Sequence, residues 1–144
     1  MKIIVIVKSK RKGNTMQIAE AMAEVAPVTI TELENANCYN IEQYDIIGLG
    51  SGIFLGKHYK ELIKFARTVK NKFCFVFSTS GINSLDKVNG ALIKLLEDSG
   101  KTVLGSFACR GAFLGKNKGH PDMDDFDNVQ QFINEVIETF NKVK

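Results

Sequence analysis

The order of apolar and polar positions divides the chain into alternating strands and helices. Residues 2–7 form a short, continuous run of mostly β-branched side chains, which is typical of a strand buried on both faces. From Thr15 onward, apolar side chains recur at helical spacing until Pro27 closes the segment. The first unit is therefore a strand, a loop and a helix.

The same alternation continues along the rest of the chain. Residues 28–30 predict a weak second strand, 44–50 a third, 72–81 a fourth and 102–109 a fifth. Residues 62–69, 85–96 and 126–140 have apolar positions at helical spacing. Alternating elements with buried strands imply a parallel sheet covered by helices on both faces. We predict a single α/β domain over residues 1–144, built as a three-layer α/β/α sandwich with five parallel strands.

Composition narrows the class of protein. The 144 residues, 44% of them hydrophobic, are enough for one buried core. No apolar stretch approaches the roughly eighteen residues that span a bilayer, and the N-terminal apolar run is too short for a signal peptide. We therefore expect a soluble, cytoplasmic protein that has no membrane partner.

The charge and the cysteines give no indication of nucleic-acid binding, of disulfides or of a metal site. The net charge of +3 is too small to indicate nucleic-acid binding. The basic excess is local, because residues 1–12 carry five basic side chains and no acidic one. Cys38, Cys74 and Cys109 are far apart and lack metal-ligand spacing, so we predict neither disulfides nor a metal site.

The loop after the first strand is a candidate phosphate site. Ligands of such sheets bind at the carboxyl ends of the strands. Free N–H groups at the helix start, together with the hydroxyls of Ser9 and Thr15, would form a phosphate cradle, and Gly13 would allow close approach. An ordinary turn with Asn14 or Thr15 as helix cap, surrounded by solvated lysines, explains the segment equally well.

The glycines of residues 48–58 match neither of two better-known phosphate motifs. A P-loop would need another glycine at a fixed interval before Gly56 and a Ser or Thr in place of His58. A dinucleotide-binding fingerprint would need a third glycine where Ile53 stands. We exclude both motifs.

Four motifs taken together resemble the short-chain flavodoxin family. They are SKRKGNT at 9–15, YDIIGLGSGIFLGKH at 44–58, FVFSTSG at 75–81 and KGHPDMDD at 118–125, in the family's order and over nearly the whole chain. The first loop is one residue longer than the common Ser/Thr-x-Thr-Gly-Asn-Thr, and Lys12 stands where Thr is usual.

This resemblance implies a strand order of 2-1-3-4-5 and a non-covalent FMN cofactor. By analogy, the phosphate would be bound by the first loop, which comprises Ser9, Lys10, Arg11, Lys12, Gly13, Asn14, Thr15 and Met16. Ser51, Gly52, Ile53 and Phe54 would follow the ribityl chain and pack beside the flavin. Ser78, Thr79, Ser80 and Gly81 would line its pyrimidine edge.

Few aromatic side chains are available to stack on a flavin. Phe54 is the one aromatic residue inside a candidate ring loop, and we expect Tyr59 on the following helix. Phe113 either reaches the flavin or anchors its own loop. His58 either relays a proton to the flavin or only forms hydrogen bonds within its loop.

The candidate ligand loops are basic. Segments 8–16, 50–60, 78–84 and 109–120 contain no Asp or Glu, and their basic residues are Lys8, Lys10, Arg11, Lys12, Lys57, Lys60, Arg110, Lys116 and Lys118. Positive potential favours the anionic reduced flavin, so we expect a higher two-electron potential than in a relative with an acidic rim. It also favours a redox partner protein with an acidic surface, or NAD(P)H.

Three functions are compatible with these features. The first is an FMN-binding electron-transfer protein, which requires no catalytic residue. The second is an FMN-dependent NAD(P)H oxidoreductase of the quinone or flavin reductase type, and the sequence leaves open whether the protein is an enzyme. The third is a flavodoxin-like module that has lost its flavin and binds another phosphate ligand or a protein.

Overall fold

The computed structural model describes residues 1–10, 13–81, 84–112 and 117–144. Its parallel sheet has the spatial order β2-β1-β3-β5-β6. These strands are β1 (Ile3–Lys8), β2 (Val28–Glu32), β3 (Ile46–Phe54), β5 (Phe73–Ser80) and β6 (Thr102–Arg110). The predicted five parallel strands and their order are confirmed, with β5 and β6 as the predicted fourth and fifth strands. A short additional strand, β4 (Lys57–His58), pairs antiparallel with the end of β3.

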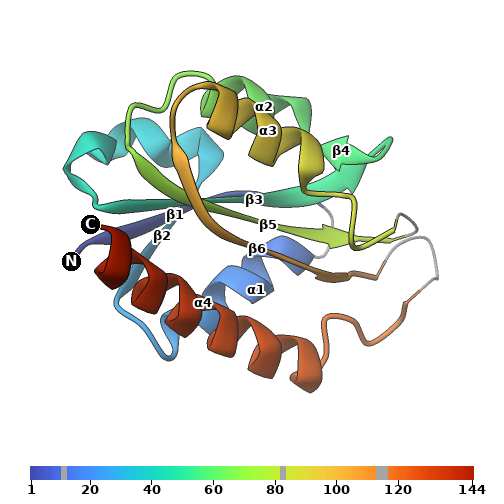
Figure 1. Cartoon of the computed structure of the whole chain (residues 1–144). Coiled ribbons are helices and arrows are strands. Elements are labelled where there is room, and N and C mark those ends of the chain that lie inside the picture. Colours follow the sequence, from blue (N-terminus) through green and yellow to red (C-terminus); the bar gives the residue numbers. More distant parts are fainter. Residues whose placement is uncertain (11–12, 82–83, 113–116) are drawn as a thin grey trace.

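Helices cover both faces of the sheet (Figure 1). One face packs against α1 (Asn14–Ala23) and α4 (Met123–Val143). The other packs against α2 (Lys60–Ala66), α3 (Gly90–Asp98) and the 3-10 helices η1 (Leu33–Cys38) and η2 (Ile41–Gln43). The predicted three-layer sandwich is therefore confirmed. Within the described ranges, no helix combines the length and the apolar character that a bilayer crossing requires.

Two glycines of β3 make room for aromatic rings of β5. Gly48 is opposite Phe75 and Gly50 is opposite Phe77 in the parallel register. A Cβ at either glycine would overlap the facing ring. Phe75 also packs edge-on against Phe132 of α4, with ring centroids 5.7 Å apart. The glycine-rich pattern of this strand thus serves the core, which agrees with its failure to match the two phosphate motifs.

Several element boundaries differ from the sequence prediction. β3 continues to Phe54 rather than ending at residue 50, because its last residues pair with β4 in a hairpin. α3 begins at Gly90 rather than near residue 85. Ahead of it, consecutive turns follow Ser84, and the Asn89 side chain donates a hydrogen bond to the Phe107 carbonyl. Apolar spacing alone does not distinguish such turns from a helix.

Candidate functional site

The candidate loops meet at one edge of the sheet. In register, Lys8 at the end of β1 is opposite Ser51 of β3, and Ser51 is opposite Ser78 of β5. Ser80 is in turn opposite Arg110 at the end of β6. Because all these strands run parallel, their carboxyl ends lie side by side. The tertiary structure therefore brings together the three predicted binding segments.

The first loop leads into α1 through a left-handed glycine. Gly13 has a φ of 70° and is the N-cap of the helix, without any side-chain capping bond. The first helical hydrogen bond runs from the Gln17 N–H to the Gly13 carbonyl, at 3.0 Å. The N–H groups of Asn14, Thr15 and Met16 precede it and have no acceptor within the helix. They form a ready donor set for an anion.

The side chains of this loop connect it to neighbouring strand ends. Asn14 donates a hydrogen bond to the Ala112 carbonyl at 3.0 Å, and the Thr15 hydroxyl lies 2.9 Å from that of Thr79. A role for Asn14 or Thr15 as the helix cap is therefore wrong, since both belong to the helix and their side chains bond elsewhere. The buried Ser9 hydroxyl has no hydrogen-bond partner among the described residues. Arg11 and Lys12 lie outside the described residues.

Ser51 positions the second segment. Its buried hydroxyl donates a hydrogen bond to the Gly52 carbonyl at 2.7 Å and accepts one from the Tyr59 N–H at 3.1 Å. The Tyr59 ring packs so closely on Gly52 that a Cβ there would overlap the phenol oxygen. Tyr59 is the N-cap residue of α2, and the Lys10 ammonium lies 4.5 Å from its ring centroid. The first and second segments thus touch through Lys10 and Tyr59.

Ile53 and Phe54 belong to the β3–β4 hairpin. Its two-residue loop is formed by Leu55 and Gly56, whose φ angles of 53° and 79° are typical of a type I′ turn. Ile53 is half-buried, whereas 67% of Phe54 is exposed. The hairpin therefore presents Phe54 to solvent beside the strand ends.

The third segment is the end of β5. Ser78, Thr79 and Ser80 are buried, and Gly81 is half-buried. Like Ser9, Ser78 has a buried hydroxyl without a hydrogen-bond partner in the described part of the chain.

Gly111 and Asn117, which follow β6, are bonded to this third segment. The Gly111 N–H donates a hydrogen bond to the Ser80 carbonyl at 3.3 Å, and the Asn117 amide donates one to the Gly81 carbonyl at 2.6 Å. Asn117, with a φ of 55°, was not predicted as a site residue. The sequence does indicate a turn at this position, because Asn adopts left-handed backbone more readily than most residues. Phe113 and Lys116, in the same loop, lie outside the described residues.

His58 is buried behind the site. Only 3% of it is exposed, and its Nε2 lies 3.0 Å from the Phe77 carbonyl. A carbonyl can only accept, so Nε2 carries the proton and donates it. Burial lowers the pKa of His58 to about 4, although the hydrogen bond to Phe77 opposes the shift. Of the two roles considered for His58, the structure shows a hydrogen-bonding one, and the partner belongs to β5 rather than to the loop of His58.

The positive charge of the candidate ligand loops is partly neutralised by acidic residues from other segments. Lys8 forms an ion pair with Glu34 at 2.8 Å, and this hydrogen bond raises the pKa of Lys8. Lys10 lies 3.8 Å from Glu61. A charge count over the loops alone misses both contacts.

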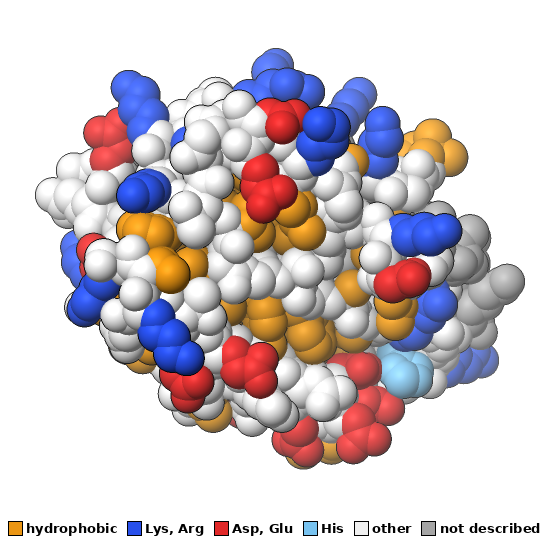
Figure 2. Space-filling model, in the orientation of Figure 1, with side chains coloured by type: hydrophobic (Ala, Val, Ile, Leu, Met, Phe, Trp, Pro, Cys, Tyr) orange, Lys and Arg blue, Asp and Glu red, His pale blue; other side chains and the backbone are white. Residues whose placement is uncertain are grey.

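Some other basic side chains of the candidate ligand loops are exposed and unpaired among the described residues. Figure 2 shows Lys and Arg side chains along the top, left and right of one face, and several Asp and Glu side chains over the start of α4 at its lower right. Lys57, Lys60 and Lys118 are the exposed basic residues of the candidate loops that have no ion pair among the described residues. Positive charge thus remains at the hairpin and at the loop before α4.

His120, Asp122 and Asp125 form the start of α4. Asp122 and Asp125 make a reciprocal capping box, and His120 Nδ1 lies 2.9 Å from Asp125. That hydrogen bond raises the pKa of His120. The possible ligand atoms of the three residues lie within 4.8 Å of one another. Helix capping accounts for this cluster.

A family model described as a flavodoxin domain matches residues 5–116. The chain belongs to the flavodoxin domain family. An uncharacterized protein of Methanocaldococcus jannaschii is 34% identical to it over 148 residues, covering 95% of this chain and 99% of the relative. The resemblance to flavodoxins inferred from the four motifs is therefore confirmed.

Solved flavodoxins have the same fold. A flavodoxin from the domain Archaea superposes with a TM-score of 0.70 at 16% identity, covering 98% of this chain and 99% of that one. Oxidised flavodoxin 1 from Bacillus cereus gives a TM-score of 0.68 at 18% identity, with coverages of 96% and 98%. At these identities the likeness establishes the fold.

Proposed function

We propose that this flavodoxin-domain protein binds FMN non-covalently and acts as an electron-transfer protein. The observation that carries the proposal is the buried hydroxyl of Ser9, which has no hydrogen-bond partner among the described residues and precedes the N–H groups at the start of α1. A buried hydroxyl without a partner costs free energy, and a bound phosphate would satisfy it. Two solved structures that resemble this fold, from the domain Archaea and from Bacillus cereus, are flavodoxins, which supports the choice of a flavin.

The residues present fit such a cofactor. Ser9 and the N–H groups of Asn14, Thr15 and Met16 would hold the phosphate. Ser51 and Gly52 would border the ribityl chain, and Ser78 would offer its hydroxyl at the end of β5, which no described residue bonds. Phe54, exposed on the hairpin, is available to pack against the ring. Bound FMN would supply reversible one- and two-electron transfer, and the protein would supply binding and orientation.

The test compares FMN with riboflavin, which lacks the phosphate. Binding to the apoprotein is followed by quenching of flavin fluorescence. Ser9→Ala should weaken FMN binding about tenfold or more, because a hydrogen bond to a charged group contributes roughly 1.5–3 kcal/mol. Riboflavin affinity should not change. Ser99→Ala, at an exposed site after α3, is the matched control. An apoprotein that binds no FMN would remove the proposal.

The exposed basic side chains support a partner with an acidic surface. Lys57 belongs to the β3–β4 hairpin, Lys60 begins α2 just after it, and Lys118 follows Asn117, which is bonded to Gly81. Such charges steer anionic partners, so electron-transfer rates with an acidic protein should fall as salt rises. The same positive charges would also attract the anionic NAD(P)H, so an FMN-dependent NAD(P)H oxidoreductase remains the alternative function. Steady NAD(P)H consumption by the FMN-loaded protein without a partner reductase would favour the enzyme.

A further inference from the structure

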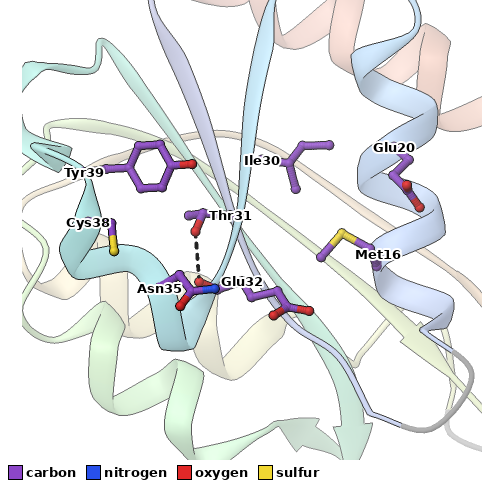
Figure 3. Close-up of a pocket in the computed structure, with 8 residues that line it drawn as sticks. All are labelled: Met16, Glu20, Ile30, Thr31, Glu32, Asn35, Cys38 and Tyr39. Atoms are coloured by element: carbon purple, nitrogen blue, oxygen red, sulfur yellow. Dashed lines mark hydrogen bonds between the residues drawn. The ribbon is translucent and has the colours of Figure 1, made fainter.

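A second concave surface lies along the outer edge of β2, toward its carboxyl end at Glu32 (Figure 3). The sheet order ends at β2, and no described strand pairs with its outer side. The cavity has a volume of about 480 Å³. We call it the β2 groove; its lining residues are Met16, Glu20, Ile30, Thr31, Glu32, Asn35, Cys38 and Tyr39.

The groove straddles the strand edge. Met16 and Glu20 come from α1, which packs on one face of the sheet. Cys38 and Tyr39 come from the end of η1, which packs on the other face. Figure 3 shows the two pairs on opposite sides of β2. Between these walls, the free N–H and C=O groups of an edge strand can pair with another extended chain.

The groove is acidic. Residues 13–56, which include all of its lining, contain no Lys or Arg, and their acidic residues are Glu20, Glu24, Glu32, Glu34, Glu42 and Asp45. Glu24, Glu34, Glu42 and Asp45 all accept hydrogen bonds or form ion pairs. The carboxylates of Glu20 and Glu32, in the groove, have no such partner within the described ranges. The Lys8 ammonium, which forms its ion pair with Glu34, also attracts Glu32 electrostatically. The negative charge of the groove is therefore only partly compensated by the described residues.

We propose that the β2 groove binds an extended, basic segment of a partner protein as an added β-strand. The backbone of the segment would pair with β2, whose five residues span about 17 Å at the usual rise of a strand. Its Lys or Arg side chains would lie against Glu20 and Glu32, and one could pack on the Tyr39 ring. The groove and the proposed flavin site share Met16, which lines the groove and whose N–H belongs to the phosphate donor set, but strand addition at β2 does not require a bound flavin.

Charge also argues against a second copy of this chain as the occupant. Edge-to-edge pairing of two β2 strands would place the Glu20 and Glu32 carboxylates of both copies around one interface. Like charges facing each other across paired strands are destabilising. A basic partner segment removes that repulsion.

The experiment uses the full chain and a fluorescein-labelled peptide of four Lys-Val repeats. Binding is measured by fluorescence anisotropy at low salt, and hydrogen exchange reports on residues 28–32. Two further peptides carry N-methyl groups on every Lys or on every Val amide. Since a strand pairs through alternate residues, one methylated peptide should lose binding about tenfold or more while the other retains it. The amides of β2 should exchange more slowly when the unmodified peptide is bound.

Charge variants complete the test. The double variant Glu20→Gln/Glu32→Gln should weaken peptide binding about tenfold, whereas Glu24→Gln/Glu42→Gln, outside the groove, should change it less than about twofold. Equal binding of all three peptides, or equal loss in the two variants, would overturn strand addition. Peptide binding without protection of residues 28–32 would overturn it too. Protection that rises with protein concentration alone would assign the edge to a second copy and overturn the proposal.

Discussion

The hydroxyl of Thr15, at the start of α1, lies 2.9 Å from the hydroxyl of Thr79, near the end of β5. Both residues are buried, with 2% and 5% of their surfaces exposed. This bond connects the candidate phosphate loop to the third candidate segment across 64 positions of sequence. The two loops therefore hold their relative position through a buried polar contact.

Removing one of these hydroxyls should destabilise the protein. Thr15→Val leaves the Thr79 hydroxyl buried and unpaired, and we expect the free energy of unfolding to fall by about 1–3 kcal/mol. Thr139→Val, at a half-buried threonine whose hydroxyl donates to the Glu135 carbonyl within α4, is the control. In urea unfolding, the double variant Thr15→Val/Thr79→Val should lose less stability than the sum of the two single variants. Strict additivity would show that the two hydroxyls are not coupled.

Gly50 should not accept a side chain. A Cβ at this position would overlap the Phe77 ring, so Gly50→Ala should lower the free energy of unfolding by about 1–3 kcal/mol or more. Gly90→Ala, where no heavy atom lies within 4 Å of the added Cβ, should be neutral or stabilising. Thermal unfolding measures both. Phe77→Leu should rescue part of the loss in Gly50→Ala if the overlap is its cause.

Buried His58 should make the protein less stable at acid pH. Its pKa is about 4 in the folded protein and near 6.5 when unfolded, so the unfolded state binds the proton first as pH falls. Stability is therefore highest above pH 6.5 and declines toward pH 4, by at most about 3 kcal/mol from this group. His58→Gln keeps a donor near Phe77 without the titration. Urea unfolding between pH 4 and 7.5 should show a shallower decline for this variant than for the wild type, and equal slopes would contradict the assignment.

One thiol of the folded protein should react. Cys38 is exposed, whereas Cys74 and Cys109 are buried. Burial raises the pKa of Cys74 to about 12 and that of Cys109 further still. A disulfide reagent such as DTNB should modify one thiol quickly under native conditions and all three in denaturant. Cys38→Ser should abolish the fast phase, and its persistence would place the reactive thiol elsewhere.

Local patterns predicted most of the elements but not all of their ends. The β-branched run at residues 2–7 and the helical spacing after Thr15 correspond to β1 and α1. The helix predicted from residue 85 instead starts at Gly90, since turns can place apolar residues at similar spacing. The β3–β4 hairpin was missed because β4 is only two residues long and forms through pairing with β3.

For the candidate site, the sequence determined which loops contain the phosphate-type residues, because parallel strands present their carboxyl ends at one edge. The flavodoxin resemblance added the strand order and the cofactor. Only the tertiary structure decided which side chains remain available: Thr15 bonds Thr79, whereas the Ser9 hydroxyl has no partner in the described part of the chain.

For the charges, too, the sequence determined one part and the tertiary structure another. The sequence determined that the candidate loops are basic and that residues 13–56 hold only acidic charge. The tertiary structure decided that Glu34 and Glu61 neutralise Lys8 and Lys10, and that Glu20 and Glu32 share a groove at the open edge of β2. The physical reason is that local propensity acts over a few residues, whereas these contacts depend on how the crossovers place distant segments side by side.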